Sequence, residues 1–277
     1  MRVLVTGANG YLGKGVVQQL QKDGVDVIAT DITDTNLFNN YKKADLFAIE
    51  DPYNYFDKPE IVLHLAWRNG FQHNSLSHLE DFPKHYMFLQ KMAQSGIKQM
   101  SVLGSMHEIG FFEGSINEHT SANPENLYGI SKNALRKAIE LLCKQYNIVY
   151  QWIRGYYIVG NTPDGCSIFS KIVQAENHGD STFPFTQGMN QYDFIDYDNF
   201  CIQVAAAVQQ TEVDGIINCC SGMPMKLSER VEKFIKENNY KIKLEYGAFP
   251  DRPYDSKAVW GNDEKIKRIL MNRKNQI

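Results

Sequence analysis

The sequence predicts an α/β fold in which a doubly wound parallel sheet carries a smaller lobe built from later insertions. Strand and helix patterns alternate strictly over about the first 160 residues, and the strands are short continuous apolar runs. Such runs are typical of parallel sheets covered on both faces. After that point glycines and prolines separate shorter pieces. We expect a dinucleotide-type first domain over 1–160, to which about 191–220 returns, and a C-terminal lobe over about 161–190 and 221–277.

The composition is that of an ordinary soluble protein, with 43% apolar and 22% charged residues. A net charge of −3 gives no support for nucleic acid or an anionic membrane as a partner. Five scattered cysteines lack metal-ligand spacing, so we expect reduced thiols and no metal site. No basic-then-apolar leader precedes the first strand at Arg2, and no apolar run approaches the roughly 18 residues of a membrane span. We therefore expect a cytoplasmic location.

A glycine-rich turn follows the first strand, Arg2–Thr6, and opens the first helix. Glycines let the backbone turn tightly and approach a pyrophosphate, which the N–H groups and partial positive charge of a helix N-terminus attract. Strand, turn and helix together match the dinucleotide fingerprint of a Rossmann-type fold, although a plain glycine turn would look similar. We expect cofactor contacts from Gly7, Gly10, Tyr11, Leu12 and Gly13.

The second strand, Val25–Thr30, ends in an acidic residue, Asp31, followed by Ile32. This carboxylate lies about 20 residues beyond the glycine turn, where a group that binds the adenosine ribose is expected. No Lys or Arg follows before Lys42, so a 2′-phosphate has no obvious partner and NAD is favoured over NADP. We expect Asp31 and Ile32 at the ribose, and Asp45 and Leu46 over the adenine.

The run Ile61–Ala66 is a buried strand whose end offers further cofactor contacts. Leu65 and the small Ala66 give the cofactor a backbone to lie against, whereas His64 is expected to be a core histidine. Arg68 follows the carboxyl end of this strand, where ligands bind in open α/β sheets. It is a candidate substrate contact or a solvated loop residue.

Tyr128 and Lys132 are separated by about one helical turn, so the phenol and the ammonium share a face. A nearby cation favours phenolate, so we expect Lys132 to lower the pKa of Tyr128 and make it an acid/base. This spacing is common on exposed helices and carries weight only in context. Ser105, at the end of the strand Met100–Leu103, is placed to hydrogen-bond a substrate oxygen.

Taken together, these residues resemble the extended short-chain dehydrogenase/reductase family, in its NAD-dependent nucleotide-sugar epimerase, dehydratase and reductase branch. The resemblance covers nearly the whole chain. It implies that Tyr128 exchanges a proton with a sugar hydroxyl or carbonyl while the nicotinamide exchanges hydride with the same carbon, usually C4. Lys132 would hold the nicotinamide ribose, Ser105 would bond the reacting oxygen, and Tyr156 would contact the cofactor. Arg252 matches the family arginine that grips the diphosphate.

Departures from the family pattern narrow the activity. In the 4,6-dehydratases an acidic pair follows the catalytic Ser or Thr, whereas this chain has Met106 and His107 there, followed by Glu108. Dehydration is therefore disfavoured, and His107 is a candidate substrate contact or a structural residue. The segment 104–110 resembles 4-keto-6-deoxysugar reductases more than epimerases. Tyr157 replaces a family Asn that contacts the substrate, and Tyr192 replaces an Arg.

We expect an NAD(P)-dependent oxidoreductase acting at C4 of a nucleotide-activated sugar, a 4-keto-6-deoxysugar reductase. The alternatives are a nucleotide-sugar 4-epimerase with retained NAD, a sugar or uronate dehydrogenase, and a non-catalytic dinucleotide sensor on the same fold. The resemblance also implies a homodimer formed through helices over 83–95 and 127–146.

Overall fold

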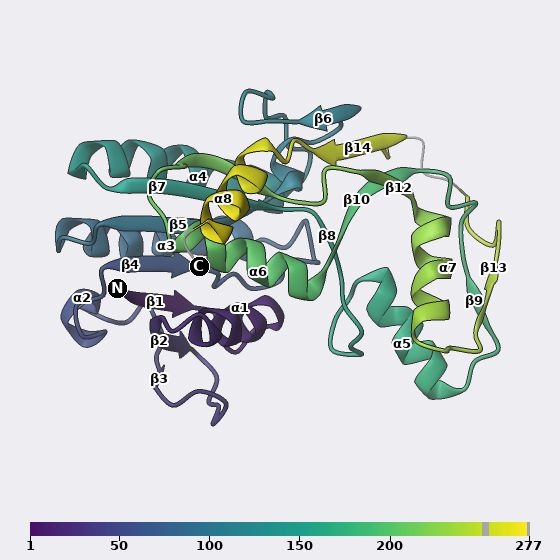
Figure 1. Ribbon diagram of the computed structural model, residues 1–277, viewed down its shortest axis with the longest axis horizontal. Helices are drawn as coiled ribbons and strands as arrows, with labels where there is room; N and C mark the ends of the chain where they lie inside the picture. The colour runs from purple at the N-terminus through teal and green to yellow at the C-terminus, as the bar shows by residue number, and fades with distance from the viewer. Residues whose placement is uncertain (251–254, 276–277) are drawn as a thin grey trace.

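The computed structural model describes residues 1–250 and 255–275, which form a large sheet-centred body and a smaller lobe (Figure 1). The body contains a seven-stranded sheet in the order β11-β7-β5-β4-β1-β2-β3. Every neighbouring pair in it is parallel. The chain starts at β1, in the interior of the sheet, and winds outward in both directions, which confirms the doubly wound α/β prediction. The strands are β1 (Arg2–Thr6), β2 (Asp26–Asp31), β3 (Tyr41–Lys43), β4 (Ile61–His64), β5 (Gln99–Ser105), β7 (Val149–Gly155) and β11 (Gly215–Cys219).

Helices cover both faces of this sheet, which explains why its strands are apolar throughout. One apolar core joins the sheet to α1 (Tyr11–Lys22), α6 (Tyr197–Val208) and α8 (Glu264–Lys274). A second core joins the other face to α3 (Ser77–Gln94) and α4 (Leu127–Tyr146), with the short α2 (Pro52–Tyr55) beside them. The carboxyl edge of the sheet is left uncovered by helices, so loops can form a site there.

The lobe has its own apolar core around a five-stranded sheet. Its strands run in the order β12-β10-β14-β6, and β8 pairs with β10. Figure 1 shows α5 and α7 at the far end of the lobe, next to the pair β9 and β13. The elements are β6 (Gly114–Ile116), β8 (Tyr157–Val159), α5 (Ile168–His178), β9 (Thr182–Pro184), β10 (Gln191–Asp196), β12 (Pro224–Lys226), α7 (Leu227–Glu237), β13 (Lys243–Glu245) and β14 (Ala258–Gly261).

Three details differ from the sequence prediction. In the returning segment 191–220, α6 and β11 join the body, but β10 lies in the lobe sheet. Conversely α8, which the prediction groups with the lobe, buries Ile266 and Ile269 in the core of the body. The helix expected over 83–95 starts earlier than predicted, because α3 begins at Ser77 and contains Pro83. A proline within an apolar pattern reads as a helix start, but here it lies in the second turn.

Candidate active site

The glycine turn between β1 and α1 is held tightly against the end of β4. Gly7 has φ +70°, and a Cβ atom there would lie 2.7 Å from the amide nitrogen of Ala66. A Cβ at Gly13 would overlap the carbonyl oxygen of Gly7. Side chains are therefore excluded at both positions, which keeps the backbone N–H groups of the turn accessible to a bound anion.

Asp31 lies beside this turn, as a ribose-binding residue would. Its carboxylate accepts a hydrogen bond from the amide of Asn9 at 3.2 Å and from the amide of Thr33 at 3.2 Å. Ile32 is exposed. The two residues expected over the adenine lie in different environments. Asp45 is exposed, whereas the Leu46 side chain is buried in the core under α3. Any adenine contact from Leu46 is therefore left to its backbone.

The helix α4 carries Tyr128 and Lys132 to the carboxyl edge of the sheet. Asn126 starts the helix by accepting a bond from the amide of Gly129 at 2.8 Å. A Cβ at Gly129 would overlap the carbonyl oxygen of His107, so a glycine lets the first turn lie directly on the segment that follows Ser105. This places Tyr128 near Ser105, whose side chain acts to lower the pKa of the phenol. The structure thus brings together the Ser, Tyr and Lys that the sequence singled out.

The expected lowering of the Tyr128 pKa is wrong for this arrangement. Burial raises the pKa of Tyr128 to about 12, and the Ser105 side chain opposes that rise only in part. Burial lowers the pKa of Lys132 to about 7, against the opposing influence of Glu108. Desolvation is the largest cause of both pKa shifts.

Four side chains that the sequence analysis did not assign to the site surround this pair: Trp67, His73, His78 and His85. The indole of Trp67 has the Lys132 ammonium 4.0 Å from its ring centroid. The ring of His73 stacks on Tyr128 at 12°, with centroids 5.7 Å apart. Their only sequence signal was a histidine-rich loop directly after a buried strand.

Trp67 and His73 lie in the loop after β4, whereas His78 and His85 lie on α3. The amide of Tyr128 donates to the carbonyl oxygen of His73 at 2.8 Å. His64, buried as predicted, lies between Thr6 and His85, at 2.8 Å and 2.9 Å from them respectively. Burial is the main reason that the pKa values of His64, His73 and His85 are lowered, that of His85 to about 3. The imidazoles of His64, His73 and His85 are therefore neutral at neutral pH.

Glu108, the remaining candidate for a dehydratase acid, is fully buried. Its carboxylate accepts from the amide of Ser105 at 2.6 Å and from the indole of Trp152 at 2.9 Å. It also pairs with Arg154 at 3.6 Å and Arg136 at 3.7 Å. A carboxylate so fully engaged holds Ser105 in place and is not free to exchange protons with a substrate.

The other predicted contacts fall into different places. His107 lies in the pocket, with its ring centroid 6.0 Å from that of Tyr128, and burial lowers its pKa to about 4. Arg68 is engaged in ion pairs with Asp81 and Glu80 on α3, so its charge is already partnered. The ring of Tyr156 is buried in the lobe core, where Gly261 leaves room for it. That packing gives Tyr156 no contact with the Tyr128 pocket.

Tyr157 and Tyr192, the two departures from the family pattern, meet in the lobe. Their rings stack with centroids 4.5 Å apart at 29°. Tyr192 lines a hollow of about 600 Å³ between α5, α7 and the segment before β10. Lys171, Asn190, Phe249 and Asp255 also line it. Arg252, the predicted diphosphate contact, lies outside the described residues.

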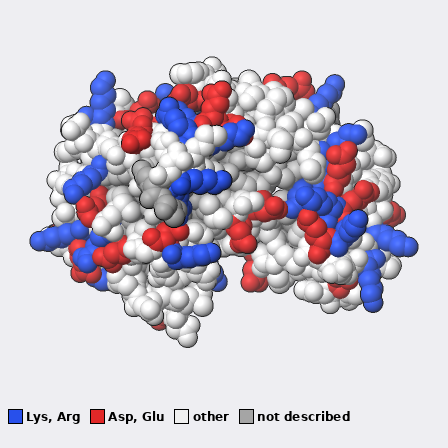
Figure 2. Space-filling view, viewed as in Figure 1, with Lys and Arg blue, Asp and Glu red and all other residues white. Residues whose placement is uncertain are grey.

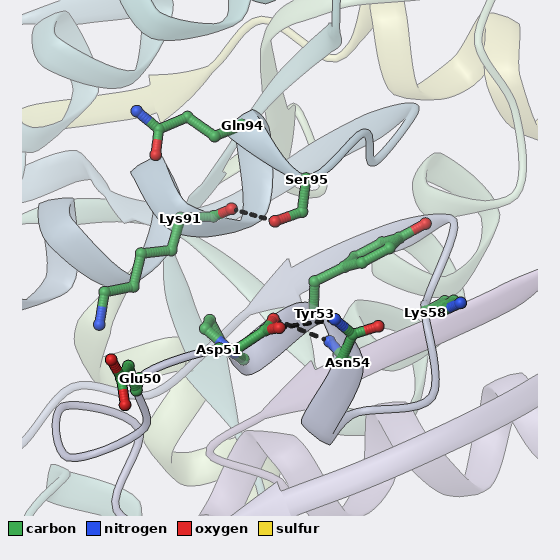
Figure 3. Close-up of a pocket in the computed structure, with 9 residues that line it drawn as sticks. Glu50, Asp51, Tyr53, Asn54, Lys58, Lys91, Gln94 and Ser95 are labelled. Atoms are coloured by element: carbon green, nitrogen blue, oxygen red, sulfur yellow. Dashed lines mark hydrogen bonds between the residues drawn. The ribbon is translucent and has the colours of Figure 1, made fainter.

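A second hollow of about 590 Å³ lies beside the large sheet, at the amino ends of its strands (Figure 3). It is lined by Lys91, Gln94 and Ser95, from the end of α3, and by Asp51 and Asn54 of the α2 segment. These elements directly precede β4 and β5, so the hollow is at the amino ends of the strands. Ligands of open α/β sheets bind at the other edge, and this polar depression contains none of the predicted site residues.

The parallel sheet, the glycine turn beside Asp31 and the Ser, Tyr and Lys group define a dinucleotide-binding protein with an acid/base site. The chain belongs to the NAD dependent epimerase/dehydratase family, whose model matches residues 3–220. This confirms the resemblance to the extended short-chain family, the prediction of an oxidoreductase or epimerase, and NAD as the cofactor.

Individual relatives point in the same direction. The chain is 42% identical to a dTDP-6-deoxy-L-talose 4-dehydrogenase (NAD(+)) of Aggregatibacter actinomycetemcomitans, over 94% of this chain and 99% of that protein. It is 28% identical to a UDP-glucose 4-epimerase of Lactobacillus helveticus, over 98% and 91%. Among solved structures, a UDP-N-acetylglucosamine 4-epimerase of Methanobrevibacter ruminantium M1 superposes with a TM-score of 0.81 at 19% identity, covering 97% of this chain and 91% of that one. That last likeness shows the shared fold.

Surface and helix properties agree with the composition. Figure 2 shows acidic and basic side chains interspersed over the visible face. Among the helices of the described ranges, none has both the length and the apolarity needed to cross a bilayer. In the same part of the chain, no group of three or more His, Cys, Asp or Glu side chains is arranged to hold a metal ion.

Proposed function

We propose that the protein is an NAD-dependent oxidoreductase that interconverts the 4-hydroxyl and 4-keto forms of a dTDP-linked 6-deoxyhexose. The observation that carries this proposal is the placement of Tyr128, on the first turn of α4, against the segment that follows Ser105, with Lys132 one turn further along the helix. The identity of 42% with a dTDP-6-deoxy-L-talose 4-dehydrogenase supports the sugar and the position.

The chain's own residues would supply binding and proton transfer. Tyr128 would take the proton of the C4 hydroxyl when the alcohol is oxidised and return it when the ketone is reduced. Ser105 would donate to or accept from the same oxygen, and Lys132 would hold the ribose near the reacting carbon. When bound, NAD supplies the hydride acceptor or donor. The neutral imidazoles around Tyr128 would leave the sugar facing hydrogen-bonding groups without a competing charge.

The hollow in the lobe fits the nucleotide half of this substrate. Phe249 and the stacked Tyr192 offer aromatic faces for a base, and Asn190 offers an amide to its polar edge. Lys171 is the cation among the described residues that line the hollow, and it would pair with the diphosphate. Family members have an Asn at the position of Tyr157 and an Arg at the position of Tyr192. We propose that Lys171 supplies the attraction for the substrate that those two residues would provide.

A 4-epimerase is the second candidate, because a 28% identical relative is a UDP-glucose 4-epimerase. An epimerase keeps NAD bound and regenerates it within one turnover. The test incubates purified protein with dTDP- and UDP-hexoses and their 4-keto forms, with NAD or NADH, and follows absorbance and product. Stoichiometric NADH formation with a dTDP-6-deoxyhexose supports the dehydrogenase. C4 inversion without net NADH supports the epimerase, and inactivity on the whole panel rejects both.

We also propose a homodimer formed through α3 and α4. Leu79 and Met87 of α3 and Ile130 and Leu141 of α4 are exposed apolar residues on these neighbouring helices. Water-exposed apolar side chains gathered on two packed helices favour association. Size-exclusion chromatography with light scattering should give twice the chain mass, and Met87→Lys with Leu141→Lys should shift it to the monomer.

A further inference from the structure

Trp67 lies where the two proposed functional side chains of α4 meet the loop after β4. Its indole has the Lys132 ammonium 4.0 Å from the ring centroid. The same ring meets Tyr128 at 72°, with centroids 6.2 Å apart. The ammonium also donates to the carbonyl oxygen of Leu103 at 2.8 Å. One backbone oxygen and one aromatic face therefore fix the direction of the Lys132 side chain.

The indole is itself held in place by two histidines. His85 stacks on it at 10°, with ring centroids 4.6 Å apart. The Trp67 indole N–H donates to Nδ1 of His78 at 3.0 Å, and Nε2 of His78 lies 3.0 Å from the carbonyl oxygen of Gln72. Since an indole can only donate, His78 accepts at Nδ1 and carries its proton at Nε2. The ring of Trp67 thus has little freedom to turn away from Lys132.

We propose that Trp67 is a positioning residue, which holds the charged form of Lys132 beside Tyr128 through a cation–π contact. The negative face of an indole attracts an ammonium most strongly where water is excluded, and Lys132 is 2% exposed. An aliphatic side chain of similar volume would fill the space without that attraction. The chemical roles of Lys132 and Tyr128 rest on the proposed function, whereas the contact itself does not.

Other ionisable groups near Lys132 also affect the pH at which its ammonium titrates. Burial lowers the pKa of Lys132 to about 7, and the buried carboxylate of Glu108 opposes that effect. His64 and His85 are the nearby imidazoles whose pKa values the charge of Lys132 helps to lower. Removing the indole face would destabilise the ammonium further. The pKa of Lys132 should then fall below its value in the unchanged protein.

The test compares Trp67→Met, which keeps bulk without a ring, with Trp67→Phe, which keeps a ring. Trp260→Met, in the lobe strand β14, is the matched control. Lysine-labelled protein is titrated by NMR, and Lys132→Arg identifies the Lys132 signal. We expect the Lys132 titration to move to lower pH in Trp67→Met and to stay close to the original in Trp67→Phe and Trp260→Met. With an active substrate, kcat of Trp67→Met should fall about tenfold at unchanged melting temperature.

Equal titrations of Lys132 in the Met and Phe variants would overturn the proposal. If a variant does not fold, a second NMR measurement on the original protein still tests the proposal. Lys132 side-chain protons near an indole face should show an upfield ring-current shift there. Absence of that shift would also overturn it. Both NMR readouts use no substrate, so inactivity on every nucleotide sugar rejects the proposed function alone.

Discussion

The carboxyl edge of the seven-stranded sheet and the hollow of the lobe are assembled in different ways. At the edge, Ser105, Tyr128 and Lys132 come from two adjacent elements, β5 and α4, and from segments with recognisable spacing. The lobe hollow draws on α5, on the segment before β10, on α7 and on the segment around Phe249, which are far apart in the chain. The difference teaches that the proposed chemical group is built from short segments with recognisable spacing, whereas the proposed substrate hollow depends on long-range packing.

The largest effect should come from removing the acid/base at the edge. Tyr128→Phe keeps the ring that stacks on His73 but removes the hydroxyl, so kcat should fall by about 10³-fold or more. NAD binding, measured by fluorescence titration, should change little. Tyr146→Phe, at the exposed end of the same helix, is the control. Activity equal to that of the unchanged protein would contradict the role of Tyr128.

The next effect concerns the buried ion cluster behind Ser105. Glu108→Gln removes the charge that faces Arg154, whose side chain is 1% exposed, and should lower the unfolding free energy by about 3 kcal/mol. Glu140→Gln is the matched control, because Glu140 pairs with the same Arg136 but is half exposed, so its loss should cost less than about 0.5 kcal/mol. Urea unfolding measures both. Equal stabilities of the two variants would argue against a structural role for the Glu108 cluster.

Lowering the pH should destabilise the structure around the carboxyl edge of the large sheet before it destabilises the lobe. The pKa values of His64, His73, His85 and His107 are lowered in the folded protein, so below about pH 6.5 the unfolded chain binds more protons. Stability should therefore fall from pH 7 toward pH 4. The pKa of His178, exposed at the end of α5 in the lobe, is instead raised by Asp180.

The contribution of one imidazole to this slope can be isolated. Because burial lowers the pKa of His85 to about 3, it should contribute up to about 1.4 kcal/mol of unfolding free energy per pH unit between pH 6 and pH 4. Thermal unfolding across that range should show a shallower slope for His85→Phe. A slope for His85→Phe that equals or exceeds that of the original protein would contradict this prediction.

The smallest effect should come from the lobe. Lys171→Ala removes a cation from the rim of the hollow, so KM for the nucleotide sugar should rise about fivefold while kcat changes less than twofold. Initial-rate measurements with the free sugar, which lacks the diphosphate, should show no difference between variant and original. A fall in kcat without a change in KM would place Lys171 outside the nucleotide half of the site.

The sequence was sufficient to predict the features that depend on neighbours in the chain. Gly7 and Gly13 predicted a tight turn, and the spacing of Tyr128 and Lys132 predicted that both lie on one helix face. Trp67 and His85 could not be predicted in the same way, because a tryptophan in a polar loop and a histidine within a helix have no periodic signal. They become part of the site only when α3 packs beside α4.

Tertiary context also changed two predicted properties. We expected Lys132 to lower the pKa of Tyr128, but burial raises it. We considered Arg68 as a substrate contact or a solvated loop residue, and Asp81 and Glu80 on α3 are its ion-pair partners. Neither the burial of a side chain nor the identity of a distant ion-pair partner is visible in local spacing, which is why the sequence predicted neither of these features.

The position of α8 bears on how the protein forms during synthesis. This helix contributes Ile266 and Ile269 to the core that it shares with α1 and α6, although it is the last helix of the described chain. The chain must therefore be synthesised past α8 before the NAD-binding body can close this hydrophobic surface. Until then the nascent body exposes the apolar face that α8 covers, so elements near its first strand depend on a segment made about 250 residues later.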